Sequence, residues 1–110
     1  MRKKIVRLKD LPEGTTKRFS FQRDGMRVDA FVANFKGDIV AYENLCRHLP
    51  ITLDYGDGEF FSSDGSLFVC QTHGAFYEPE TGLCIDGPCT GASLIPLETE
   101  QSDGHIFLVR

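Results

Sequence analysis

The stretch CQTHGAFYEPETGLCIDGPC, residues 70–89, decides how the rest of the chain is interpreted. It places Cys70 and His73 three residues apart and follows them with Gly and Pro residues. Upstream, NLCRHLP places Cys46 and His48 two residues apart. The chain thus has a C-x-H pair and, after the 21 residues 49–69, a C-x-x-H pair. Two loops that each carry a thiolate and an imidazole predict one shared metal site.

Two metal centres suit such a donor set. A single zinc ion accepts two thiolates and two imidazoles in a tetrahedron, and a [2Fe–2S] cluster can take two Cys on one iron and two His on the other. Spacing alone does not separate these two possibilities. Zinc fingers usually pair Cys with Cys and His with His, whereas each loop here is mixed, which favours the two-iron cluster. Any one of these residues, taken alone, is more often a core or surface residue.

Short apolar runs between turn signals indicate an all-β chain. Turn sequences such as RDG (23–25), KGD (36–38) and SDG (102–104) recur at short intervals, and Asp-Gly pairs are typical of hairpins. No window shows a sustained helical period. The chain therefore reads as antiparallel hairpins forming a sandwich or small barrel. Strands are expected at 5–8, 26–35, 38–42, 66–70 and 105–110.

Composition is that of one small folded domain. The chain has 110 residues, 41% hydrophobic and 25% charged, which suits a single domain over residues 1–110. No run approaches the length of a membrane helix, and the basic N-terminus lacks the apolar segment of a secretory signal. A cytoplasmic location is the expectation, and there cysteines remain reduced and serve as metal ligands more often than as disulfides.

Charge is distributed unevenly along the chain. The formal net charge is −4. Residues 1–18 carry seven Lys or Arg against two acidic residues, and residues 19–110 carry five against fourteen. The acidic body indicates either an ordinary solvated surface or a face that attracts a basic protein partner. Nucleic-acid binding is disfavoured because the body of the domain has no basic patch.

The second Cys/His stretch resembles the Rieske-type ferredoxins, and the resemblance extends from about Leu8 to Arg110. It follows that family's C-x-x-H-G-[AS]-x-[FY] run, Thr-Gly turn and Gly-Pro loop, and GPCTGASLIPLETE is similar to the family's return strand. The first stretch departs from the family pattern, because Pro50 stands where a Gly is usual. The gap between the two stretches is also longer, with GDGEFFSSDGS (56–66) expected to extend a hairpin.

The resemblance implies a fold and a ligand set. The fold would be an all-β, Rieske-like arrangement of three small antiparallel sheets with a cluster-binding tip subdomain. The two cysteines would bind the inner iron and the two histidines the outer iron. Gly74 would allow a tight turn, and Gly87 and Pro88 would form the loop that covers the cluster. The implied ligands of the [2Fe–2S] cluster are Cys46, His48, Cys70 and His73.

The function implied by this resemblance is one-electron transfer and not catalysis. The chain would pass electrons from a reductase to an oxygenase or other redox enzyme, with no small-molecule substrate, nucleic acid or membrane as partner. The alternatives are a zinc-stabilised interaction module and a small redox subunit of a larger enzyme. A terminal oxygenase is disfavoured, because it needs a second iron site and His105 is the one histidine outside the ligand set.

The sequence leaves two possible roles open for three further residues around the Gly-Pro loop. Cys84 and Cys89 are expected not to be ligands, and they are either reduced thiols or a disulfide that braces the loop. Reduced thiols are favoured in a cytosolic setting. Tyr77 stands where relatives have a Tyr that donates to a ligand sulfur, and it is otherwise a core aromatic.

Overall fold

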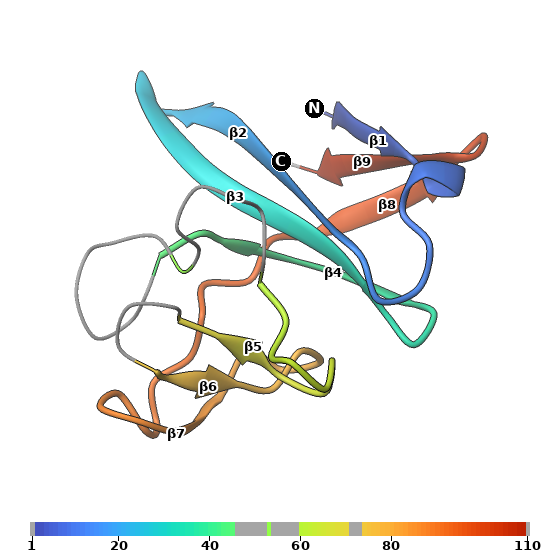
Figure 1. The fold of residues 1–110 in the computed structure, drawn as a ribbon. Coiled ribbons are helices and arrows are strands. Elements are labelled where there is room, and N and C mark those ends of the chain that lie inside the picture. Colours follow the sequence, from blue (N-terminus) through green and yellow to red (C-terminus); the bar gives the residue numbers. More distant parts are fainter. Residues whose placement is uncertain (1, 46–52, 54–59, 71–73, 110) are drawn as a thin grey trace.

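The computed structural model describes residues 2–45, 53, 60–70 and 74–109. These residues form nine strands and one short 3-10 helix, η1 (Leu8–Asp10) (Figure 1). The strands are β1 (Arg2–Arg7), β2 (Thr16–Arg23), β3 (Met26–Phe35), β4 (Asp38–Glu43), β5 (Phe68–Val69), β6 (Phe76–Tyr77), β7 (Cys84–Asp86), β8 (Thr99–Ser102) and β9 (His105–Val109).

Three antiparallel sheets contain these strands, in the orders β1-β9-β8, β2-β3-β4 and β5-β6-β7. Because Arg2 pairs with Val109, the first and last strands lie side by side (Figure 1). The first two sheets are called the base below. The third sheet, with the residues around it (60–70 and 74–95), is called the tip, and it lies at the opposite end of the molecule from sheet β1-β9-β8 (Figure 1).

The hairpins of the base form at the predicted turns. Each two-residue turn places both of its central residues at positive φ, which is the requirement of a type I′ turn. That geometry matches the right-handed twist of the flanking strands, so the Asp-Gly and Lys-Gly pairs set the register of three hairpins. The turn residues are Asp24–Gly25, Lys36–Gly37 and Asp103–Gly104, with φ between 52° and 95°.

The second half of β3 is buried on both faces of the middle sheet, which explains the nearly continuous apolar run there. Alternate side chains of a strand point to opposite faces. Phe31 and Ala33 pack in a cluster with residues of the tip. Val32 packs on the other face with Val6 and Ile106 of sheet β1-β9-β8. The base therefore has a core of its own and also supplies one wall of the core under the tip.

The all-β, three-sheet prediction is confirmed, with corrections to individual strands. The strand predicted at 26–35 is observed, and that at 38–42 extends to Glu43. The strand predicted at 66–70 is only Phe68–Val69, and the opening strand begins earlier and ends before Leu8, which starts η1. β2 was not predicted, because its sequence TKRFSFQR is largely polar. The three separate sheets also replace the expected single sandwich or barrel.

The expected hairpin extension before β5 is present where the structure describes it. Ser62 N donates to Leu67 O at 2.7 Å, and Val69 N donates to Phe60 O at 2.9 Å. Asp64 closes the turn by accepting from Ser66 N at 3.0 Å and from the Ser62 hydroxyl at 2.7 Å. These hydrogen bonds to the charged form lower the pKa of Asp64 to about 2.

Among the described residues, no helix has the length and apolar character needed to cross a membrane.

Candidate metal centre

Cys70 is the predicted ligand that the structure describes, and its backbone anchors the second Cys/His loop. It follows β5 directly and is fully buried. Cys70 N donates to Ala75 O at 2.8 Å, and Gly74 N donates to Cys70 O at 2.8 Å. Gly74 has φ of 71°, a conformation that favours glycine. The loop is thus closed at its base by two backbone hydrogen bonds, as expected for the turn at Gly74.

The Gly-Pro loop packs directly on this closure. A Cβ atom at Gly87 would lie 2.7 Å from Ala75 Cα and 3.1 Å from Gly74 O. Real Cβ atoms do not approach other atoms so closely, so the loop can take this position only because residue 87 is glycine. Gly87 N is held by Asp86 Oδ1 at 2.9 Å. The predicted covering loop therefore contacts the residues that immediately follow the predicted ligand His73.

The first Cys/His loop has its own closure. Asn44, at the end of β4, is buried, and its Oδ1 accepts from Leu53 N at 2.8 Å. Glu43 N donates to Ile95 O at 2.9 Å, which ties the same strand end to the return segment after the Gly-Pro loop. Asn44 was not singled out from the sequence. Its position two residues before a predicted cysteine ligand was the available signal.

Both closures belong to one core. Leu53, Cys70 and Ala75 are buried in a single apolar cluster. Described residues that flank both ligand loops therefore share one core, and the predicted ligands Cys46, His48 and His73 lie outside the described residues. The described residues alone contain no group of three or more metal-ligating side chains. The four-ligand set is still a prediction.

Aromatic side chains fix the tip on the base. The rings of Phe31 and Phe60 stack with centroids 4.0 Å apart, and Phe68 meets Phe31 edge to face at 5.1 Å. The Tyr42 hydroxyl donates to Pro79 O at 2.8 Å. Burial, and secondarily the charge of Glu80, raises the pKa of Tyr42 to about 12, so this hydroxyl stays protonated as a donor.

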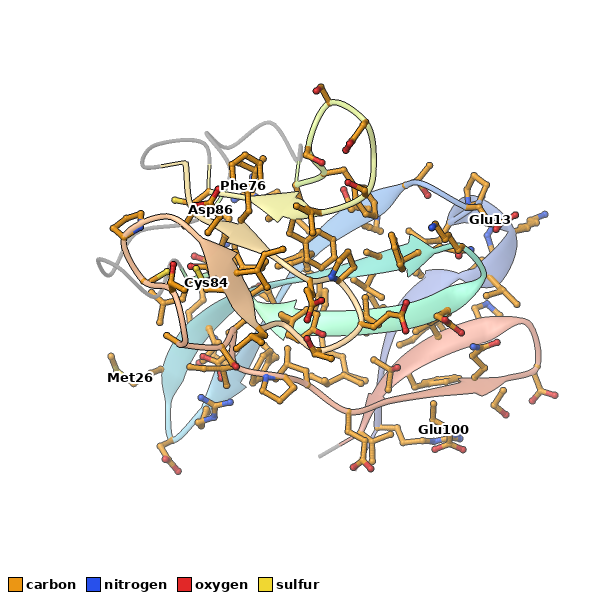
Figure 2. The ribbon with its side chains drawn as sticks, turned by 90° about the horizontal axis from the view of Figure 1, so that it is seen from below. Glu13, Met26, Phe76, Cys84, Asp86 and Glu100 are labelled. Atoms are coloured by element: carbon orange, nitrogen blue, oxygen red, sulfur yellow. The ribbon has the colours of Figure 1, made fainter. Side chains whose placement is uncertain are left out.

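The two remaining cysteines contact each other, and they are the thiols that the sequence favoured over a disulfide. Cys84 and Cys89 are free thiols, with their Sγ atoms 3.2 Å apart. The hydroxyl of Tyr77, which is fully buried, lies 3.1 Å from Cys89 Sγ. That Tyr77 also donates to a ligand sulfur is still a prediction. Figure 2 shows Cys84 and Asp86 beside Phe76, far from Glu13 and Glu100.

Comparison with known proteins identifies the family. The model of the Rieske [2Fe-2S] domain matches residues 1–101. The chain belongs to the Rieske [2Fe–2S] domain family. The match begins earlier and ends earlier than the resemblance from about Leu8 to Arg110 suggested.

Individual relatives agree with this assignment. Over 73 residues the chain is 32% identical to the menaquinol:cytochrome c reductase iron-sulfur subunit of Geobacillus thermodenitrificans, a match that spans 66% of this chain and 41% of that protein. A chain in the complex of reduced oxygenase and oxidised ferredoxin in carbazole 1,9a-dioxygenase matches with a TM-score of 0.76 and 26% identity, covering 97% of this chain and 91% of that one. The ferredoxin of carbazole 1,9a-dioxygenase from Nocardioides aromaticivorans IC177 shares the fold, with a TM-score of 0.72, 19% identity, and coverage of 98% and 96%.

The cofactor of this family is a [2Fe–2S] cluster, and the described residues fit it. Cys70 supplies a buried sulfur at the start of the second ligand loop. Gly87 allows the Gly-Pro loop to pack on Gly74 and Ala75, which follow that loop. Two thiolates and two imidazoles are the donors of a Rieske cluster. The zinc module is not favoured by the family match. The chain therefore has the domain and the cofactor type of the Rieske family.

Proposed function

We propose that this chain is a one-electron carrier that takes an electron from a reductase and passes it to an oxygenase or other redox enzyme. The observation that carries the proposal is the convergence of both ligand-loop closures, at Asn44–Leu53 and at Cys70–Ala75, on one buried cluster. We expect this arrangement of buried side chains to hold the [2Fe–2S] cluster rigidly at one end of a small domain. The carbazole dioxygenase complex, in which a ferredoxin meets an oxygenase, supports the choice of partner class.

In this proposal Cys46 and Cys70 bind one iron, and His48 and His73 bind the other. The cluster supplies reversible one-electron chemistry when bound. The chain positions it: Cys70 is fixed by the backbone of Ala75, and Gly87 of the covering loop packs on Gly74 and Ala75. We further propose that residues 1–110 form a single domain and that the protein works in the cytoplasm, without a catalytic site of its own.

The charge of the tip supports a basic protein partner. Residues 48–109 contain no Lys or Arg. The tip carries Asp64, Glu78, Glu80 and Asp86, all but Glu78 exposed. Two apolar side chains, Leu83 and Ile85, are 38% and 44% exposed among these acids. Exposed acids and exposed apolar side chains in the tip fit a partner that presents the opposite charge and a small apolar patch.

Electron transfer to cytochrome c, a basic one-electron acceptor, tests the proposal. The protein is reduced with dithionite and mixed with oxidised cytochrome c in a stopped-flow instrument at low and high salt. We expect transfer of one electron per chain, several-fold slower at low salt in a Glu80→Gln, Asp86→Asn variant. A Glu13→Gln, Glu98→Gln variant, which removes two exposed charges from the base, is the matched control and keeps the original rate.

Two results would contradict the proposal. A protein that cannot be reduced and reoxidised by one electron is no carrier. Equal slowing in the tip and base variants would show that the acidic tip is not the docking surface and that the rate depends only on net charge.

One observation favours a second candidate, a small redox subunit within a larger enzyme. The matched relative from Geobacillus thermodenitrificans is an iron-sulfur subunit, and the match spans 41% of its length. Co-purification of a tagged chain separates the two possibilities. A subunit remains bound to its enzyme through gel filtration at high salt, whereas a diffusing carrier elutes alone.

A further inference from the structure

The sulfur atoms of Cys84 and Cys89 lie within a short chain of polar contacts. Cys89 S–H donates to Cys84 Sγ at 3.2 Å, and Cys84 S–H donates to Asp86 O at 3.3 Å. The Tyr77 hydroxyl is 3.1 Å from Cys89 Sγ and completes the chain. Cys84 is 1% exposed and Cys89 is half-buried, so a reagent can reach one sulfur and not the other.

The backbone already holds the two cysteines together. Cys84 N donates to Ala92 O at 2.8 Å, and Gly91 N donates to Cys84 O at 3.0 Å. Ala92 N in turn donates to Cys89 O at 2.9 Å. A disulfide needs sulfurs about 2.05 Å apart, so the bond forms with a movement of about 1 Å. Because the loop is closed in advance, this movement does not require the tip to unfold.

We propose that Cys84 and Cys89 are a reversible dithiol–disulfide site that reacts with small-molecule disulfides such as oxidised glutathione. The Cys89 thiolate attacks the glutathione disulfide, which forms a mixed disulfide and releases one glutathione. Cys84 then loses its proton and attacks Cys89 Sγ, which releases the second glutathione. In total two thiols are oxidised and one glutathione disulfide is reduced to two glutathione molecules.

The environment of Cys84 sets the order of these steps. Burial first, and then the hydrogen bond and charge of Cys89, raise the pKa of Cys84 to about 11. Cys84 therefore remains protonated and unreactive while Cys89 is a free thiol. Formation of the mixed disulfide removes the hydrogen bond and the charge of Cys89 that raise the pKa of Cys84. Deprotonation of Cys84 is therefore favoured when it has to attack.

Oxidation of this pair has a structural consequence at the second ligand loop. Cys89 follows the Gly-Pro loop, and Gly87 of that loop packs on Gly74 and Ala75. A disulfide ties this loop covalently to β7. It also removes the hydrogen bond from the Cys84 S–H to Asp86 O and the one from the Cys89 S–H to Cys84 Sγ. The site stands on described residues and does not depend on the proposed role in electron transfer.

Mass mapping of the purified holoprotein tests the site. The protein is incubated with oxidised glutathione, free thiols are trapped with N-ethylmaleimide in denaturant so that buried Cys84 is also accessible, and the chain is cleaved after glutamate. The fragment 81–98 then contains Cys84 and Cys89 and none of the predicted ligands. We expect this fragment to lose two hydrogen atoms and take up no maleimide, and we expect dithiothreitol to restore both thiols.

Two conservative variants give the controls. Cys84→Ser should accumulate a stable glutathione adduct on Cys89, because the second step is missing. In Cys89→Ser, Cys84 should react with oxidised glutathione at least tenfold more slowly than Cys89 does in the wild type. A wild-type fragment that keeps two maleimide-reactive thiols, or that stops at the adduct seen in Cys84→Ser, would overturn the proposal.

Discussion

The base and the tip are built from the same kind of hairpin but hold together differently. In the base, β2 and β3 pair over eight residues and β3 and β4 over six, in unbroken register. In the tip, β5 pairs with β6 over two residues, and β6 pairs with β7 over two with a register shift at Phe76–Tyr77. A two-residue ladder satisfies few backbone groups, so most hydrogen bonds of the tip come from its turns and loops.

Because of this difference, the base is expected to supply most of the stability of the domain, and the tip to carry the cluster. The base pairs its strands in long regular ladders and buries one face of its middle sheet against sheet β1-β9-β8, so much of its structure does not depend on the tip. The tip depends on glycines in special positions, on aromatic contacts with the base and on the cluster that its loops bind. Binding free energy of a metal centre acts as folding free energy for the region that it orders. We therefore expect perturbations of the cluster to unfold the tip first.

Removal of a cluster ligand should produce the largest difference between the tip and the base. Cys70→Ser should abolish bound iron, and amides of the tip such as Val69 N and Cys84 N should lose protection from hydrogen exchange. Protection in β2 and β3 should persist, because their ladder does not involve the tip. Mass spectrometry of exchanging backbone segments measures both regions in one experiment.

The control for that prediction is a cysteine pair of the same tip. A Cys84→Ser, Cys89→Ser variant should retain its iron, because the four predicted ligands do not include these residues. Loss of iron in this variant, or equal loss of protection in the base and the tip of Cys70→Ser, would contradict the division drawn here.

The close contact of the Gly-Pro loop predicts an intermediate effect. Gly87 and Gly91 both have positive φ, 103° and 95°, so alanine is strained at either position. A Cβ at Gly87 meets the backbone of Ala75 at 2.7 Å, whereas one at Gly91 meets nothing within 4 Å. Gly91→Ala should lower the free energy of unfolding by about 1–2 kcal/mol, and Gly87→Ala by about 1–3 kcal/mol more. Urea unfolding gives both values, and equal losses would show that the loop does not press on the ligand-loop closure.

The smallest effect is expected from one hydroxyl. If Tyr77 donates to a ligand sulfur, Tyr77→Phe removes a hydrogen bond that stabilises the reduced cluster. A loss of about 0.5–1.5 kcal/mol corresponds to a fall of about 20–60 mV in the midpoint of a one-electron couple. Protein-film voltammetry measures it.

Tyr42→Phe is the matched control, because its hydroxyl is bonded to Pro79 O. It should lower stability and leave the midpoint unchanged. An unmoved midpoint in Tyr77→Phe would mean that this hydroxyl serves only the contact with Cys89.

The sequence predicted those parts of the molecule whose signals are local. Asp-Gly and Lys-Gly turns placed the hairpins around β3 and β9, and β3 itself was predicted residue for residue. The Gly-Pro loop was predicted from the resemblance, and the structure adds the reason, since Gly87 leaves no room for a side chain. The four-ligand set was likewise expected, but it stays a prediction.

The features that were missed depend on contacts between distant residues. β2 has a polar sequence and is a strand because β3 pairs with it over its whole length. The strands of the tip are too short for periodicity to identify them. Asn44 closes its loop through Leu53, a contact between residues nine positions apart. Each of these follows from the tertiary structure and not from composition.

The most direct test of the central claim is the metal content of the purified protein, measured with its visible absorption and with the electron paramagnetic resonance of its reduced form. A chain whose two loops bind a Rieske cluster should be red-brown, contain two irons and two acid-labile sulfides, and give a signal that accounts for one unpaired electron. A colourless protein that contains one zinc ion per chain and gives no signal after reduction would contradict it.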